Sequence, residues 1–379
     1  MRLAFLLYTY FPYGGLQRDF KRFVEEARKR GHECRVYCIE WEGDTIPGID
    51  LRRVPARGAS HHRRNDRYAQ WVRSDLASEP VDGVVGFNKM AGLDIYFAAD
   101  PCYLDKALHQ RGPLYRRGRR FRHFAAAERA VFDPASATHI LLISATEQEK
   151  FERYYQTPSR RMHLLPPGVS PQRRAPPDAA ARRATKRAEL GFTGDEMLLL
   201  FVGSGFITKG LERAIDALGE VRRAHPDAQL VIAGQDKMRR YVRQCRKQGL
   251  SHAIQFLGGR DDVADLMLAA DVLVHPARAE AGGIVLLEAL VAGLPVVVTD
   301  VCGYAHHVAA SDGGIVLPSP FEQAALQQAL LRFADPHFRA ACAASALHYA
   351  DTTDLYSMHQ TGMDVIETVL QSGQGGNSG

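Results

Sequence analysis

The chain has 379 residues, of which 46% are hydrophobic and 24% are charged. This composition is typical of a soluble globular protein with two domains of ordinary size, and it excludes a disordered chain, collagen and a small disulfide-bonded scaffold. Residues 1–189 carry 34 basic and 22 acidic side chains, whereas residues 190–379 carry 14 and 21, so we expect the first half to face an anionic partner.

Short apolar strands alternate with amphipathic helices in the first half. Arg2–Tyr8 is predicted as a strand and Leu16–Arg30 as a helix that stops at Gly31. Residues 144–147 read Ser-Ala-Thr-Glu, a capping box that predicts a helix to about Tyr155. Further strands are expected at 35–38, 81–87, 95–99 and 139–143.

A proline-rich break at residues 166–177, followed by a charged alanine-rich stretch, predicts an interdomain linker. The strand–helix pattern then restarts, with strands expected at 197–202, 229–233, 254–257, 272–275 and 296–299 and a helix at 209–224. Two such series predict an α/β fold of two Rossmann-like domains with a cleft between them. We expect domains at 1–167 and 168–353, a helix at 354–370 that packs back on the first domain, and a disordered tail at 371–379.

Two carboxylates eight residues apart give the strongest chemical signal, in the segment EAGGIVLLE of residues 280–288. The segment follows the expected strand 272–275, so it lies at the carboxyl edge where open α/β sheets bind ligands. Gly282 and Gly283 let a diphosphate approach the backbone at a helix N-terminus. Glu288 is placed to accept bonds from ribose hydroxyls and Glu280 to meet a sugar hydroxyl; the alternatives are a local network for Glu288 and a solvated Glu280.

At this point the chain resembles family 4 of the retaining glycosyltransferases. The resemblance rests on the two glutamates, on PPGV at 166–169 and on VG at 202–203 with KG at 209–210. Longer stretches resemble the lipopolysaccharide core enzymes of this family, which add a hexose to the first inner-core heptose: YFPYGGLQRDF (10–20), VGFNKM (85–90), YFAAD (96–100) and VCGYAH (301–306). The resemblance implies a GT-B fold, a UDP-sugar donor and a lipopolysaccharide inner-core acceptor.

The resemblance also implies roles for single residues. Gly15 would contact the sugar diphosphate through its backbone, and Lys209 would neutralise the departing diphosphate. The family has Arg where this chain has Ser204, so Arg173 is our candidate for the missing charge, unless it is a solvated linker residue. Asp100 would hold or deprotonate the acceptor, unless it only caps the next turn. The remaining implied residues are, for the donor, Gln235, Arg260, Ala281, Gly282, Gly283 and Ile284, and, for the acceptor, Asp19 and Asn88.

Other chemistries lack their motifs. The chain has no Asp-x-Asp, so we expect neither a bound metal nor another cofactor, and it has no P-loop and no His-Glu-x-x-His. Gly203-Ser204-Gly205 follows a strand, but position 208 is Thr where a dinucleotide fingerprint needs its third glycine.

A basic segment, which we define as residues 105–123, reads DKALHQRGPLYRRGRRFRH. Its interleaved aromatic residues suit an anionic membrane surface; a nucleic-acid patch and an ordinary solvated face are the alternatives, and we expect no nucleic acid as partner. Its cations are Lys106, Arg111, Arg116, Arg117, Arg119, Arg120 and Arg122.

Together these features predict a transferase on the cytoplasmic face of the inner membrane, without a membrane span. It would move a hexose, glucose or an N-acetylhexosamine, with retention of configuration. The alternatives are a UDP-sugar epimerase of the same fold, which needs no acceptor, and a sugar-nucleotide sensor without catalysis.

Overall fold

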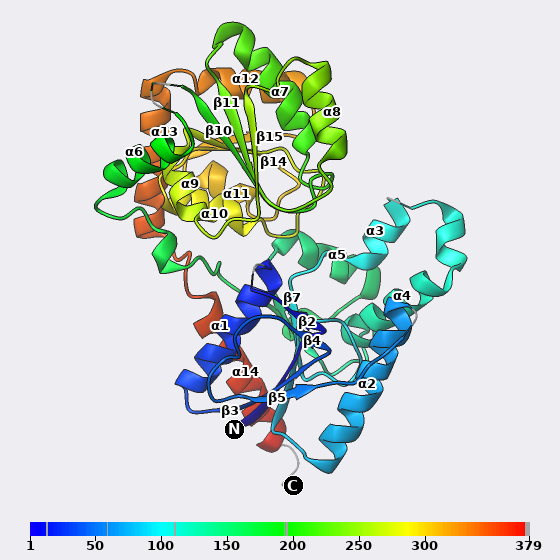
Figure 1. The fold of residues 1–379 in the computed structure, drawn as a ribbon. Coiled ribbons are helices and arrows are strands. Elements are labelled where there is room, and N and C mark those ends of the chain that lie inside the picture. Colours follow the sequence, from blue (N-terminus) through cyan, green and yellow to red (C-terminus); the bar gives the residue numbers. More distant parts are fainter. Residues whose placement is uncertain (13, 59, 110, 193, 195, 376–379) are drawn as a thin grey trace. The chain divides into compact units, whose positions relative to one another are not determined.

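The computed structural model describes residues 1–12, 14–58, 60–109, 111–192, 194 and 196–375. Within this part the chain divides into two compact units (Figure 1). The first comprises Met1–Gly168 and the C-terminal segment that starts at Ser357, and the second comprises Val169–Tyr356.

The described strands of the first unit form a parallel sheet in the order β5-β3-β1-β6-β7-β8-β9. Its strands are β1 (Arg2–Leu6), β3 (Glu33–Cys38), β5 (Asp50–Arg53), β6 (Gly83–Gly86), β7 (Ile95–Ala98), β8 (His139–Leu142) and β9 (Met162–Leu164). A separate parallel pair consists of β2 (Thr9–Tyr10) and β4 (Glu40–Trp41). The helices are α1 (Gly15–Lys29), α2 (His61–Ser78), α3 (Tyr103–His109), α4 (Arg119–Phe132), α5 (Ala145–Tyr155) and α14 (Met358–Gly375), with 3-10 turns η1 (Pro113–Arg117) and η2 (Ser159–Arg161).

Both faces of this sheet are buried, which explains why β1 is apolar almost throughout. Alternate residues of a strand point to opposite faces. Leu3 and Phe5 therefore join the cluster built on α1 and α14, whereas Ala4 and Leu6 join the cluster that contains residues of α2 and α5. Figure 1 shows α1 and α14 side by side, although they come from opposite ends of the chain.

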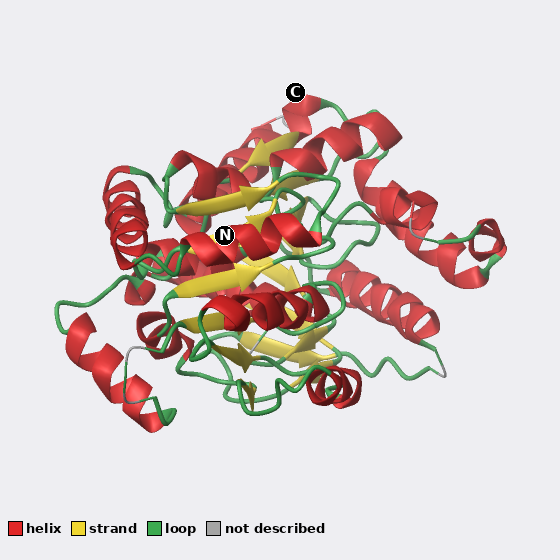
Figure 2. Ribbon diagram, turned by 90° about the horizontal axis from the view of Figure 1, so that it is seen from above, coloured by secondary structure: helices red, strands yellow, loops and turns green. Residues whose placement is uncertain are grey.

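The described strands of the second unit form a parallel sheet in the order β12-β11-β10-β13-β14-β15. They are β10 (Leu198–Val202), β11 (Gln229–Ala233), β12 (Ile254–Gly258), β13 (Val272–His275), β14 (Val296–Thr299) and β15 (Gly314–Leu317). The helices are α6 (Ala179–Glu189), α7 (Leu211–Ala224), α8 (Arg239–Lys247), α9 (Val263–Ala269), α10 (Ile284–Val291), α11 (Ala305–Ala310), α12 (Gln323–Arg332) and α13 (Pro336–Thr352), with a 3-10 turn η3 (Pro171–Arg173). The strands lie among helices in Figure 2, so the predicted α/β class is confirmed.

Local signals placed several helix ends correctly. The residue after the C-cap of α1 is Gly31, whose φ of 82° is left-handed, as a C′ glycine requires. Ser144 caps α5 by accepting a hydrogen bond from the backbone N–H of Glu147. The other half of the predicted capping box does not form, because the Glu147 carboxylate accepts from the N–H of Cys102 instead.

The predicted linker is wrong beyond residue 178. The charged alanine-rich stretch forms α6, which packs on α9 in the second unit. Arg183 donates to the carbonyls of residues 268–270 and pairs with Asp271. Its charge therefore binds the orphan carbonyls at the C-terminal end of α9. By composition alone this stretch resembles a solvated linker.

The predicted tail also needs correction, because residues 371–375 continue α14. Residues 376–379 lie outside the described part. No helix among the described residues combines the length and the apolar character that crossing a bilayer requires.

Candidate active site

Lys209 and Glu280 meet at one edge of the sheet in the second unit. Lys209 lies in the loop after β10 and Glu280 in the loop after β13, and these strands pair in parallel. Their carboxyl ends therefore share an edge, and the Lys209 ammonium forms an ion pair with the Glu280 carboxylate. The structure thus brings together two residues that the sequence assigned to the donor site.

Burial acts on Lys209. It lowers the pKa of this side chain to about 8, because a desolvated ammonium is less stable. A smaller electrostatic contribution from Cys302 opposes this effect. The Glu280 carboxylate in contact with the ammonium also favours its charged form. Lys209 is therefore a poorly hydrated cation that would gain from a further anionic ligand.

His275 lies beside this pair and was missed by the sequence reasoning. It ends β13, is fully buried, and its Nε2 lies 3.6 Å from Glu280 Oε2. Neither ring nitrogen has a hydrogen-bond partner among the described residues. Burial, with a smaller contribution from the Lys209 charge, lowers the pKa of His275 to about 3. The signal available was a polar residue at the end of the apolar strand Val272–His275.

The backbone from Glu280 to the start of α10 is fixed by a neighbouring loop. Glu280 forms a parallel bridge with Cys302. The N–H of Gly303 donates to the carbonyl of Glu280 at 3.2 Å, and the N–H of Tyr304 donates to that of Gly282 at 2.8 Å. Gly283 is the N-cap of α10 with φ 92°, a conformation that favours glycine. The predicted diphosphate segment, which also includes Ala281 and Ile284, is therefore a rigid helix start.

Glu288 is buried within α10 and pairs with Arg173. The distance from Arg173 Nε to Glu288 Oε1 is 3.3 Å, and the side chains are 18% and 7% exposed. Arg173 is therefore not a solvated linker residue, since it ends η3 within the second unit. The structure places its charge against Glu288.

Gln235 and Arg260 lie on two neighbouring loops, after β11 and β12. The backbone N–H of Gln235 donates to Ser204 Oγ, and its side-chain amide lies against Gly259. The preceding Gly234 has φ 155°, and a Cβ there would come within 2.2 Å of the carbonyl oxygen of Gly203. The Arg260 guanidinium instead forms two hydrogen bonds with Asp262, so its side chain already has a structural partner.

Four predicted residues lie in the first unit. Gly15 is the exposed first residue of α1, and a methyl group there would meet no atom within 4 Å. Asp19 accepts a hydrogen bond from His359 of α14, and Asn88 accepts one from the N–H of Tyr8. Asp100 is exposed just after β7, with no hydrogen bond or ion pair among the described residues. Each unit thus supplies its own set of predicted residues.

The basic segment folds as α3, η1 and the start of α4, and its helices stand away from the first sheet in Figure 1. All seven predicted cations are exposed, and none has an ion-pair partner in the described part of the chain. Leu114 is 76% exposed, whereas the rings of Tyr103, Tyr115, Phe121 and Phe124 contact one another. The segment is anchored by the buried Glu128 of α4, which pairs with Lys89.

Acidic, histidine and cysteine side chains form no group of three or more that could hold a metal ion, within the residues that the structure describes.

Family models match most of the chain. Residues 13–173 match the model described as Glycosyltransferase Family 4, and residues 182–346 match Glycosyl transferases group 1. The lipopolysaccharide glucosyltransferase WaaG of Escherichia coli K12 is 44% identical over 97% of this chain and 98% of its own length.

Solved structures agree with this relationship. The crystal structure of WaaG matches with a TM-score of 0.92, covering 96% of this chain and 99% of that one. The structure of Anabaena HepE in complex with UDP-glucose matches with a TM-score of 0.76 at 17% identity, covering 97% of this chain and all of that one, which supports the fold alone. The predicted GT-B fold of two Rossmann-like domains is confirmed.

Proposed function

This chain is a glycosyltransferase of family 4, and we propose that it transfers a hexose from a UDP-sugar to the first heptose of the lipopolysaccharide inner core. The proposed hexose is glucose or an N-acetylhexosamine, with retention of configuration. The name of the E. coli relative supports a lipopolysaccharide acceptor. HepE, which shares the fold, forms a complex with UDP-glucose.

The contact between Lys209 and Glu280 beside the start of α10 carries the proposal. A departing diphosphate develops negative charge, and a fixed ammonium near a helix N-terminus stabilises that charge without reorganising. When the diphosphate binds, Lys209 would exchange its contact with Glu280 for one with phosphate oxygens. Glu280 would then orient the sugar hydroxyls.

The rest of the donor would lie along the same edge of the sheet. Glu288, held by Arg173, is proposed to accept from the ribose hydroxyls. Backbone groups of Ala281, Gly282, Gly283 and Ile284 would contact the diphosphate there, and the loops of Gln235 and Arg260 would contact uracil and ribose. Gly15 of the first unit is also proposed to contact the diphosphate through its backbone.

Asp100, Asn88 and Asp19 are proposed to hold the acceptor. In the transfer step, the bond between the sugar C1 and the diphosphate oxygen breaks while the acceptor oxygen bonds to C1 on the same face. The acceptor proton passes to the departing diphosphate oxygen. No metal is required in this scheme, because Lys209 and the start of α10 supply the positive charge; an excess of EDTA should leave the rate unchanged.

The unpaired cations of the basic segment support a place at an anionic membrane. We propose that the protein binds the cytoplasmic face of the inner membrane peripherally, where a lipid-borne acceptor is presented. Binding to anionic but not zwitterionic vesicles, weakened by salt, is the expected result.

The purified protein incubated with UDP-glucose, UDP-galactose or UDP-N-acetylglucosamine tests the proposal, with lipopolysaccharide truncated after the heptoses as acceptor. UDP release should depend on the acceptor, and the product should gain one hexose. Conversion of one UDP-sugar into its epimer without acceptor would support an epimerase instead, and binding of UDP-sugar without turnover would support a sensor.

A further inference from the structure

The second unit carries its own concentration of unpaired positive charge. Residues 190–379 are net acidic and have 14 cations, yet six of these lie between Lys237 and Lys247. No acidic residue occurs from 237 to 260. The basic helix surface centres on α8, and none of its residues belongs to the proposed donor or acceptor site. We define it as Lys237, Met238, Arg239, Arg240, Arg243, Arg246 and Lys247.

Helical geometry places the cations of α8 on one side. At about 100° per residue, its five cations fall within an arc of about 120°. Tyr241 and Cys245 lie opposite this arc, and both are buried, so they fasten α8 to the unit. All six cations of the surface are exposed, and Met238 beside them is 43% exposed.

These cations differ from several other arginines of the same unit, which have an acidic partner. Arg183, Arg260 and Arg278 each pair with a carboxylate. For the basic helix surface, no ion pair occurs among the described residues. The energetic cost of concentrating like charges is therefore uncompensated within the chain, which is typical of a surface that meets an external anion.

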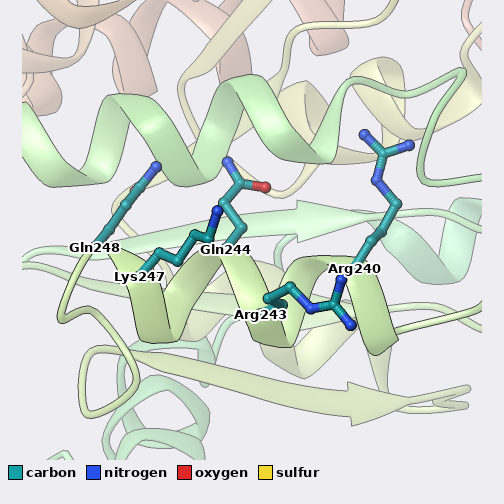
Figure 3. A pocket seen from close by; sticks show the side chains of 5 residues that line it. All are labelled: Arg240, Arg243, Gln244, Lys247 and Gln248. Atoms are coloured by element: carbon teal, nitrogen blue, oxygen red, sulfur yellow. The ribbon is translucent and has the colours of Figure 1, made fainter.

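Part of this surface lines a cavity of about 280 Å³. Figure 3 shows the side chains that line it, which are Arg240, Arg243, Gln244, Lys247 and Gln248. The amides of Gln244 and Gln248 both donate to the Asp216 carboxylate of α7, at 2.7 and 2.6 Å. That negative charge opposes a small anion in the cavity. Arg239 and Arg246 do not line this cavity. An ion bound in the cavity would therefore leave both side chains without an anionic partner, whereas an extended anionic surface would contact them as well.

We propose that this basic helix surface is a second membrane contact, which docks the donor-binding unit on anionic lipid headgroups. Exposed cations around an apolar Met238 match an anionic bilayer interface, where the charges meet headgroups and the thioether enters the acyl boundary. The inference rests on the proposed function, in which the acceptor is lipid-borne. The second unit would then contact the membrane through the basic helix surface, in addition to the contact of the first unit through the basic segment.

Sedimentation of the full chain with vesicles of phosphatidylglycerol and phosphatidylethanolamine tests the inference. Each cation near an anionic surface changes partitioning by about fivefold, so Arg239→Gln/Arg246→Gln should reduce it by about 25-fold. The control Arg223→Gln/Arg332→Gln removes two exposed cations from α7 and α12 of the same unit and should have a much smaller effect. Equal effects of the two variants would overturn the inference.

A second measurement does not depend on removing charge. Met238→Trp should shift tryptophan emission to shorter wavelength with anionic vesicles and not with phosphatidylcholine vesicles. An unchanged spectrum with both vesicles overturns lipid contact. Loss of inorganic phosphate or oligonucleotide binding in Arg239→Gln/Arg246→Gln, with unchanged vesicle binding, would assign the surface to those anions instead.

Transfer to detergent-solubilised acceptor separates this inference from the proposed function. Arg239→Gln/Arg246→Gln should retain the wild-type rate there, because neither residue is part of the proposed site. If the wild-type protein transfers no sugar but the variant still loses vesicle binding, only the proposed function fails. If transfer occurs and vesicle binding is unaffected, only the membrane contact of α8 fails.

Discussion

Arg173 and Glu288 form an ion pair in the second unit, with 3.3 Å between Nε and Oε1. Arg173 lies in the turn where the chain enters this unit, and Glu288 lies in the helix proposed to bind the donor. The pair therefore fixes the Glu288 side chain through a segment that sequence alone describes as a linker. Its removal should affect donor binding more than the chemical step.

Arg173→Ala is expected to raise the KM for the UDP-sugar by about tenfold, with a smaller change in kcat, because it removes the guanidinium that pairs with the Glu288 carboxylate. The free energy of unfolding should fall by about 2 kcal/mol, less than for a fully buried pair since Arg173 is partly exposed. Steady-state kinetics and thermal unfolding measure the two effects. Arg174→Ala, which breaks a pair with the exposed Asp351, is the matched control.

Lys209→Met should lower kcat by about 100-fold or more, because it removes the cation that is proposed to stabilise the departing diphosphate. Lys209→Arg should retain part of the activity. Lys209→Met also leaves the Glu280 carboxylate without its ammonium partner. The double variant Lys209→Met/Glu280→Gln is therefore needed to show that a loss of stability is not the cause of the lower kcat. A rate for Lys209→Met close to wild type, in folded protein, would remove Lys209 from the site.

The pH dependence of transfer should follow Lys209. Burial lowers its pKa to about 8, so the ammonium fraction, and with it donor binding, declines as the pH rises through about 8. Glu280→Gln removes the carboxylate that favours the charged form, and the decline should then begin at lower pH. Profiles of kcat/KM for the two proteins measure the difference, and coincident alkaline limbs would contradict the expectation.

Periodicity and local signals were sufficient for most strands of the two parallel sheets, because those strands are short apolar runs between turn residues. The edge strands β5, β9 and β15 were not predicted. The Glu280–Glu288 segment could also be predicted from the sequence, because its glycines and its position after a strand are local features. The pairing of Arg173 with Glu288, the buried position of His275 and the helix α6 were not predictable, because they depend on contacts made only in the folded unit. The sequence does not distinguish an arginine that binds backbone carbonyls in the folded unit, as Arg183 does, from an arginine that is exposed to water.

Acid should destabilise the second unit through His275. Its pKa is about 3 in the folded chain because of burial, and about 6.5 when unfolded. The unfolded state therefore binds an extra proton between these values, and stability that is complete above pH 6.5 declines as the pH falls toward 3. His275→Phe should flatten this part of the dependence of the unfolding free energy on pH, as urea titrations would show. An unchanged slope would mean that other groups dominate.

Gly15→Ala separates a ligand contact from a folding requirement. A Cβ at position 15 meets no atom within 4 Å, and alanine favours a helix over glycine, so the variant should be at least as stable as the wild type. If the backbone of Gly15 contacts the sugar diphosphate, the added methyl displaces it, and a shift of about 1 Å can cost about 100-fold in rate. Thermal unfolding and transfer kinetics test both expectations. Gly112→Ala, also with open space around the added methyl, is the control, and equal rates for the two variants would place the donor away from α1.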